Sequence, residues 1–109
     1  MMRLEEIYTS IAELKREDLE AWVDEALVAP EEREGELVLS DLACARIRLI
    51  CTLHYDMDIE TNALPVILDL IDQLHETRGR LDTISRAVMV QDAEIRAAIL
   101  AVVRGERKS

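Results

Sequence analysis

The stretch EDLEAWVDEALVAPEEREGELVL, residues 17–39, decides how the N-terminal part of this chain is expected to fold. Its first part has apolar residues at helical spacing from Leu19 to Leu27, and Pro30 then enforces an extended exit. The charged turn around Gly35 and the alternating residues 36–39 predict a short hairpin of two strands at most. This order of helix, turn and small hairpin is the layout of a DNA-reading helix followed by a β wing.

The charge of that helix is wrong for nucleic acid. It carries five acids and no base between residues 17 and 25: Glu17, Asp18, Glu20, Asp24 and Glu25. Phosphate contacts come from Lys, Arg and helix N-termini, so an acidic helix is not expected to read DNA. Residues 1–36 hold twelve acids and four bases, which is −8 of the formal net charge of −10. Such a surface either keeps the protein solvated or steers it toward a basic partner.

The composition predicts a mainly helical protein. The chain has 109 residues with 33% charged and 3% aromatic side chains, no Phe, three Gly and two Pro. A core must therefore be built from Leu, Ile, Val and Ala, which favours helices over sheet. No targeting segment is visible and no run approaches the roughly 20 apolar residues of a membrane span, so a cytoplasmic protein is expected.

Three helices are predicted around the decisive stretch. A short amphipathic helix is expected over residues 4–14. Ser40 is expected to cap a helix that ends near residues 56–58, and Thr61 or Asn62 to start a long helix. This pattern divides the chain into an acidic winged-helix domain, residues 1–58, and a C-terminal helical dimerisation region, residues 59–109.

The long helix has the clearest periodicity. Apolar positions recur at alternating intervals of three and four, which makes a heptad seam. The seam is predicted to carry a dimer contact through Ile67, Leu70, Leu74, Leu81 and Ile84. Thr77 and Gly79 interrupt it, so a helical hairpin or an antiparallel dimer is favoured over a long zipper. Residues 92–103 predict a further amphipathic helix that ends at Gly105.

The sequence shows no catalytic motif and predicts a protein that is not an enzyme and needs no cofactor. Its three glycines are widely separated, which excludes a phosphate-cradling loop. Cys44 and Cys51 lie about 10.5 Å apart along a helix, too far for a disulfide within it. Cys51 and His54 share a helical face, but His75 is distant, and zinc needs about four convergent ligands. The two thiols are therefore expected to be small core residues, with no metal site.

Three segments in this order resemble the CbpM family of chaperone modulators: WVDEALVAP at 22–30, LSDLACARIRLICTLHYDMDI at 39–59 and LPVILDLIDQLHETRGRL at 64–81. The resemblance covers about residues 17–84, and the last segment is its most distinctive part. The hairpin and the helix from Ser40 resemble the broader MerR-like winged-helix class. Two positions depart from that pattern, because Ala26 stands where glycine is usual and Leu39 where an aromatic residue is usual.

The resemblance implies an inhibitor that binds the J domain of a CbpA-type DnaJ paralogue and blocks its co-chaperone and DNA-binding activities. It also implies a homodimer that pairs through the long helix. J domains of this type present a basic helix, so an acidic surface is the expected contact. Two acidic faces are candidates: Glu17, Glu20 and Asp24 on the helix of the winged-helix part, and Asp69, Asp72 and Glu76 on the long helix.

Two other functions stay open. The layout and the dimerising helix also fit a MerR-like DNA-binding transcription regulator, with Arg46, Arg48 or the later arginines as its basic patch. The five acids on the reading helix count against this alternative, since each would face phosphates or acceptor-rich base edges. A small-molecule-sensing domain would instead require a closed apolar cavity.

Overall fold

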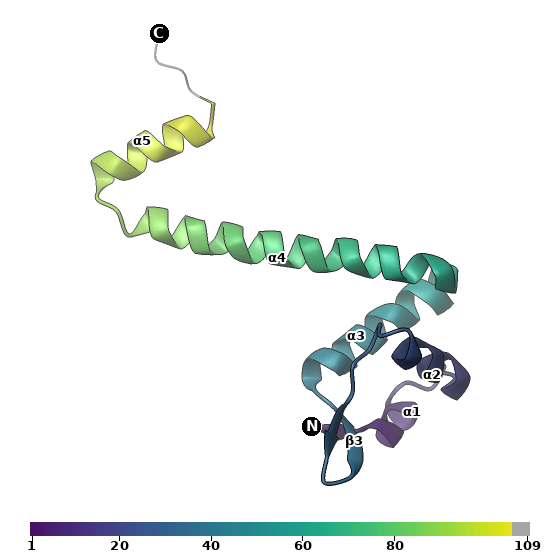
Figure 1. Ribbon diagram of the computed structural model, residues 1–109. Helices are drawn as coiled ribbons and strands as arrows, with labels where there is room; N and C mark the ends of the chain where they lie inside the picture. Colours follow the sequence, from purple (N-terminus) through teal and green to yellow (C-terminus); the bar gives the residue numbers. More distant parts are fainter. Residues whose placement is uncertain (106–109) are drawn as a thin grey trace. The chain divides into compact units, whose positions relative to one another are not determined.

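The computed structural model describes residues 1–105, which are mainly helical with a small three-stranded antiparallel sheet (Figure 1). The expectation of a mainly helical chain with a long C-terminal helix is confirmed. Contacts divide the chain into two compact units, Met1–Asp69 and a second unit that begins at Leu70. Within the described residues, no helix combines the length and the apolar content that crossing a membrane requires.

The first unit contains most of the elements. Its strands are β1 (Met2–Arg3), β2 (Glu31–Arg33) and β3 (Glu36–Leu39). Its α-helices are α1 (Ile7–Ser10), α2 (Arg16–Asp24), α3 (Asp41–Cys51) and the beginning of α4 (Leu64–Met89). Two 3-10 helices, η1 (Leu4–Glu6) and η3 (Thr61–Ala63), and a π-helix, η2 (Thr52–Asp56), complete the unit. The second unit contains the rest of α4 and α5 (Ala93–Val103).

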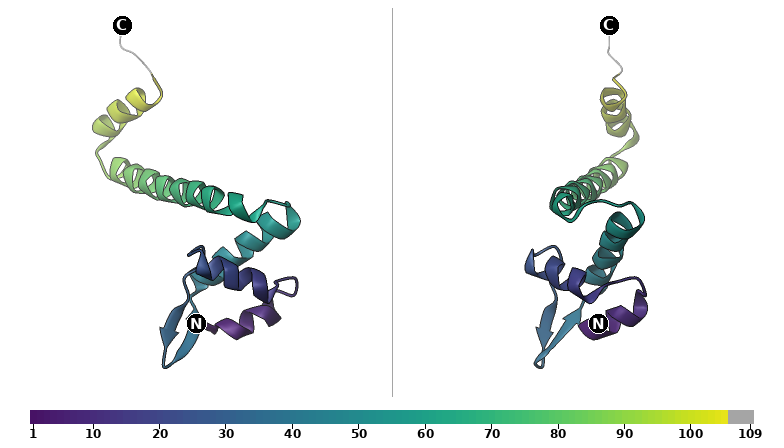
Figure 2. Two further views of the ribbon diagram at one scale, coloured as in Figure 1. Left: turned by 45° about the vertical axis from the view of Figure 1, so that its right-hand side comes forward. Right: turned by 90° about the vertical axis from the view of Figure 1, so that its right-hand side faces the viewer.

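The sheet has the strand order β1-β3-β2, and the third strand was not predicted. β1 pairs antiparallel with β3 through Met2 opposite Leu39, so the chain begins as a strand and not as a helix. The helix expected over residues 4–14 is wrong in extent, because its regular part covers only η1 and α1. The helix stops early because the backbone turns extended at Ile11, with φ −123° and ψ 98°. β1 precedes the predicted helix and covers an edge of β3 that would otherwise be open. In both views of Figure 2 the N-terminus lies beside this hairpin.

The predicted hairpin is confirmed as β2 and β3, with Arg33 opposite Glu36. Its two-residue loop holds Glu34 at φ 52° and Gly35 at φ 78°. Positive φ at both central residues is the geometry of a type I′ turn, whose twist matches that of the flanking strands. The glycine is required by this backbone conformation, since L side chains rarely adopt it.

The core of the first unit forms around Trp22, which is 1% exposed. The ring of Trp22 meets the His54 ring edge-on, with 6.1 Å between the centroids, and the Tyr55 ring at the same distance. The remaining fully buried side chains are aliphatic, as the composition predicted: Ile7, Leu19, Val28, Leu39, Ile47, Ile50, Leu64 and Leu68. Each large side chain buried in this way contributes about 1.5–3 kcal/mol to folding. Trp22 is therefore the aromatic centre of this core.

Polar contacts tie the helices of this unit together. The Tyr55 hydroxyl donates to Asp18 over 2.6 Å and accepts from the backbone N–H of Lys15 over 3.1 Å. The half-buried Arg46 donates from Nε to the carbonyl of Leu27 over 2.5 Å. These bonds join the beginning and the end of the α2 segment to α3 and η2.

Most helix boundaries after residue 39 follow the predicted signals. The predicted cap at Thr61 or Asn62 is wrong, because both residues lie within η3, whose N-cap residue Glu60 makes no side-chain cap bond. The Ser40 side chain accepts from the N–H of Ala43 over 3.1 Å and caps α3. Pro65 falls in the first turn of α4, where its missing N–H is tolerated. Asp92 caps α5 by accepting from the N–H of Ile95 over 3.0 Å. Gly105 follows α5 at φ 73°, the left-handed conformation common just after a helix.

Candidate functional site

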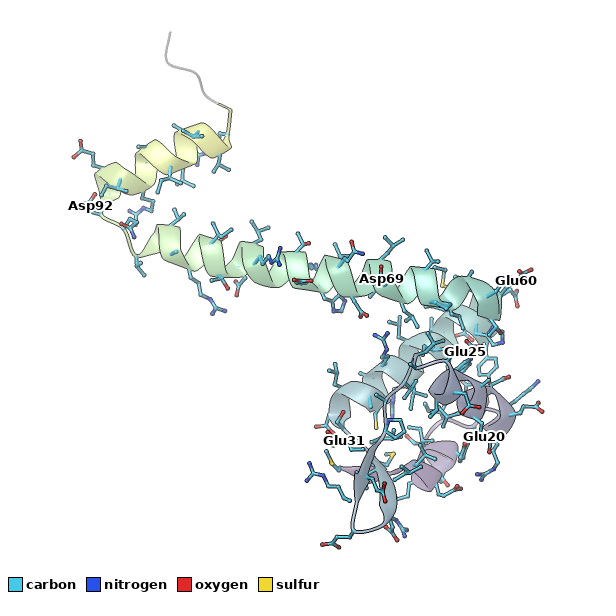
Figure 3. The ribbon with its side chains drawn as sticks, viewed as in Figure 1. Glu20, Glu25, Glu31, Glu60, Asp69 and Asp92 are labelled. Atoms are coloured by element: carbon cyan, nitrogen blue, oxygen red, sulfur yellow. The ribbon has the colours of Figure 1, made fainter. Side chains whose placement is uncertain are left out.

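The predicted acids on α2 occupy one face of that helix. Glu17, Glu20 and Asp24 are spaced three and four apart, which places them above one another, and all three are exposed. Among the described residues, no base forms a salt bridge with any of them. Figure 3 labels Glu20 on this surface. We call this surface the α2 acidic face.

A shallow hollow of about 220 Å³ adjoins the α2 acidic face. We call it the α2–β3 hollow. It is lined by Leu4, Tyr8, Leu19, Glu20, Val23, Asp24, Pro30 and Leu37. Two of these residues, Glu20 and Asp24, belong to the α2 acidic face. Five of the other six are Leu, Val or Pro, and one of these five, Leu19, is part of the buried core. The hollow therefore combines an apolar surface with a negatively charged rim.

Leu37 and Leu4 reach the α2–β3 hollow through the sheet. Successive side chains of a strand alternate between faces, so Leu37 and Leu39 of β3 share one face. Leu39 is fully buried whereas Leu37 is 48% exposed, so the strand extends from the core to the surface beside α2. β1 pairs with β3 and brings Leu4 there. A second hollow of about 320 Å³ shares Leu4 and Leu37 and adds the carboxylates of Glu5 and Glu36 and the side chain of Arg3.

The bases near the hollow are already paired. Arg16 donates two hydrogen bonds to the Glu5 carboxylate, over 2.9 and 2.8 Å, and its guanidinium lies 4.3 Å from the centre of the Tyr8 ring. The bond from Arg16 lowers the pKa of Glu5, and burial raises the pKa of Tyr8. Arg3 donates to Glu6 over 2.9 Å. Each of these cations is hydrogen-bonded to another acid, and Glu20 interacts with Arg16 only through longer-range attraction, so Glu20 and Asp24 keep the rim of the hollow negatively charged.

Such an arrangement is suited to binding. Carboxylates on the rim attract Lys and Arg side chains of a partner. The exposed apolar surface of Leu37 can contact an apolar side chain that lies between those bases. A helix with one apolar stripe flanked by bases has this complementary pattern.

The second predicted acidic face is arranged differently. Asp69, Asp72 and Glu76 share one face of α4 and are exposed, but they are divided between the two units, because the first unit ends at Asp69. Glu76 accepts from Arg80 over 2.7 Å, which offsets part of its charge. The depression beside Glu76 is lined by Gly79, Arg80, Thr83 and Ile84, and thus contains a base.

The predicted dimer seam is largely uncovered. Ile67 is half-buried. The other four residues are exposed: Leu70 by 58%, Leu74 by 56%, Leu81 by 62% and Ile84 by 60%. These side chains lack a packing surface within the part of the chain that the structure describes.

Of the two thiols, only Cys51 lies in the core of the first unit, so the expectation of two core thiols is confirmed for Cys51 and not for Cys44, and His54 is half-buried. Cys51 is buried, and burial raises the pKa of its thiol to about 11; Cys44 is half-buried. His54 Nδ1 lies 2.8 Å from the carbonyl of Ile59, and since a carbonyl can only accept, Nδ1 donates. In residues 1–105, no group of three His, Cys, Asp or Glu side chains is placed to hold a metal ion.

The sequence pattern predicts the acids of the hollow but not its apolar part. Helical spacing over residues 4–14 puts Leu4 and Tyr8 on one helix face, and Leu37 falls in the predicted hairpin. The missing information was the pairing of β1 with β3, which places residues more than thirty positions apart on one surface. The alternation of Leu37 with the buried Leu39 was the available signal.

Comparison of the chain with protein-family models, with curated proteins and with solved structures finds no match.

Proposed function

We propose that this protein is a chaperone modulator of the CbpM type, which binds the J domain of a CbpA-type DnaJ paralogue and inhibits its co-chaperone and DNA-binding activities. The observation that carries this proposal is the α2–β3 hollow, in which Glu20 and Asp24 border the exposed apolar surface of Leu37. The order of the CbpM-like segments along the chain supports the same function.

The physical basis is complementarity to a basic amphipathic helix. The resemblance implies that the J domain presents such a helix to its DnaK-type chaperone, so a protein that covers this helix competes with the chaperone. Opposite charge would speed the encounter, and apolar contact with Leu37 and its neighbours would slow dissociation. Of the two acidic faces, the α2 acidic face is the one with an adjoining apolar hollow and, among residues 1–105, with no base in a salt bridge to its acids.

We further propose that α1, α2, the β2–β3 hairpin and α3 form a MerR-like winged helix that has been adapted to a protein partner. In that fold α2 would be the recognition helix, which in DNA-binding members contacts the bases. Its exposed Glu17, Glu20 and Asp24 would face the phosphates of DNA, and this repulsion disfavours the alternative function of a transcription regulator. Pairing of two chains through the seam of Ile67, Leu70, Leu74, Leu81 and Ile84 is part of the proposal.

The test is a calorimetric titration of the full chain into the J domain of a CbpA-type co-chaperone, at low and at raised salt. A random DNA duplex serves as the control titrant. Saturable binding to the J domain that weakens with salt, with no heat from DNA, is the expected result. Absence of J-domain binding would refute the proposal, and salt-dependent binding of the duplex in its place would favour the DNA-binding alternative.

A further inference from the structure

The second unit has no interior of its own. Among its described residues, 70–105, no side chain is buried. Nine large apolar side chains are between 47% and 80% exposed: Leu70, Leu74, Leu81, Ile84, Met89, Val90, Ile95, Val102 and Val103. Soluble single chains rarely leave so much apolar surface uncovered, and large exposed patches mark interaction surfaces.

The α5 helix is apolar on nearly every side. Of its eleven residues, only Glu94 and Arg96 are polar, and the others are Ala, Ile, Leu and Val. A helix with this composition is normally buried, and an isolated helix of this length is only marginally stable in water. The α5 helix therefore requires a packing surface.

One chain cannot supply that surface completely. Only residues 90–92 connect α4 to α5, and short connections favour antiparallel neighbours. Eleven helical residues extend about 16 Å, so α5 folded back on its own α4 would reach only about the last eleven residues of that helix. The seam at Leu70 and Leu74 would stay exposed. A second chain is needed to cover it.

A second copy has the required size and chemistry. Each of the nine side chains is about half or more exposed, so their combined surface is of the order that each partner of a standard stable interface buries, about 800 Å². The surface is aliphatic, as expected for the interior of a permanent assembly rather than for the polar rim of a transient one. Heptad spacing in α4 also favours another helix as the occupant.

We infer that α4 and α5 from two copies of this chain assemble into one four-helix core, in which α5 packs on the heptad seam of α4. This inference rests on the dimer that is part of the proposed function. It adds α5, which lies outside the segments that resemble the CbpM family, as a structural part of the interface. The assembly does not depend on which partner the α2 acidic face binds.

The test compares two substitutions in the full chain. Val102→Asp places a charge on α5 at a side chain that is 77% exposed in one chain, and Leu42→Asp places the same charge on α3 at a side chain that is 80% exposed. Sedimentation equilibrium measures the dissociation constant of the dimer. A buried interface predicts that Val102→Asp raises this constant roughly 100-fold, while Leu42→Asp leaves it unchanged.

Hydrogen exchange supplies a second measurement on the unmodified chain. Amides of residues 93–103 should be protected at concentrations where the dimer forms and should exchange freely on dilution below its dissociation constant. A dimer of wild-type strength in Val102→Asp, or unprotected α5 amides in the dimer, would overturn the inference.

A third substitution, Leu74→Asp, separates this inference from the wider proposal. If Leu74→Asp yields monomers and Val102→Asp does not, the dimer uses α4 alone, and the proposed seam survives without α5. J-domain titration of the wild-type chain and of the monomeric Leu74→Asp variant then tests the proposed function separately from the assembly.

Discussion

The backbone N–H of Leu27 donates to the carbonyl of Trp22 over 2.9 Å, and this bond closes the C-terminal end of α2. Inside it, the N–H of Ala26 donates to the carbonyl of Val23 over 3.0 Å. The two bonds form a Schellman motif whose left-handed residue is Ala26, at φ 61°. Trp22 and Leu27 are both buried, so the apolar contact that usually accompanies this motif is available as well. The helix predicted to reach Leu27 consequently ends at Asp24.

Replacing Ala26 with glycine should stabilise the protein. A left-handed backbone costs an L residue about 1–2 kcal/mol, and glycine avoids this cost while losing roughly 0.5–1 kcal/mol through the entropy of its unfolded state. The net gain expected for Ala26→Gly is about 0.5–1 kcal/mol in the free energy of unfolding, measured by urea titration. Ala29→Gly is the matched control, because Ala29 is exposed and has no positive φ. It should be neutral or slightly destabilising, and a loss of stability in Ala26→Gly would contradict the strain argument.

Reversing the charge of Glu20 should slow the association with the J domain. Glu20 is exposed and lines the α2–β3 hollow, so Glu20→Lys should reduce the association rate about tenfold at low salt and flatten its salt dependence. Stopped-flow mixing at several salt concentrations measures both effects. Asp72→Lys changes the charge equally on the other acidic face and should leave the rate within about twofold. The reverse pattern would place the contact on α4.

Removing the Leu37 side chain should act on dissociation instead. Leu37 is 48% exposed, so Leu37→Ala should change the stability of the free protein little. Burying this side chain under a partner helix would contribute about 1.5 kcal/mol, which corresponds to a dissociation rate about tenfold faster in the variant. Leu42→Ala, at a side chain that is 80% exposed on α3, is the control. Equal dissociation rates for wild type and Leu37→Ala would exclude the hollow as the contact.

Stability should fall in alkaline solution as Cys51 ionises. Burial raises the pKa of the Cys51 thiol from 9.0 to about 11, so the folded state holds a proton that the unfolded state releases first. The stabilisation from this proton is complete below pH 9 and is lost as pH rises through about 11. Its size is on the order of 2 kcal/mol.

The measurement is urea unfolding of wild type and Cys51→Ala between pH 8 and 11. The variant should start from a lower stability, because it loses buried volume, and should show the shallower decline with pH. The stability of both proteins should still decline with pH because of Tyr55, since burial and the hydrogen bond to Asp18 raise the pKa of Tyr55 as well. Parallel declines in the two proteins would show that the Cys51 thiol is not responsible.

Local signals in the sequence predicted most of the elements. The Ser40 cap could be predicted because it acts within one turn of the chain, and the Asp92 cap and Pro65 in the first turn of α4 are equally local features. The heptad spacing of α4 is equally local. Four of the five predicted seam residues, Leu70, Leu74, Leu81 and Ile84, are exposed in one chain.

Features that depend on distant pairing could not be predicted in the same way. Met2 and Arg3 become a strand only because Val38 and Leu39 lie opposite them. The sequence of residues 4–14 has helical spacing in itself, and nothing within that window indicates that the preceding residues complete a sheet. The apolar part of the α2–β3 hollow depends on the same pairing, so its acids were identified and Leu4, Tyr8 and Leu37 were not.

Trp22 is the only tryptophan of the chain, and it is buried in the first unit with the rings of His54 and Tyr55 on it. Its fluorescence is therefore an intrinsic reporter of that unit alone, with blue-shifted emission in the folded state. Circular dichroism at 222 nm, by contrast, also records the helices of the second unit. Monitoring both signals during one denaturation would separate the melting of the two units without any label, and dilution should displace only the circular dichroism transition if the second unit depends on a second chain.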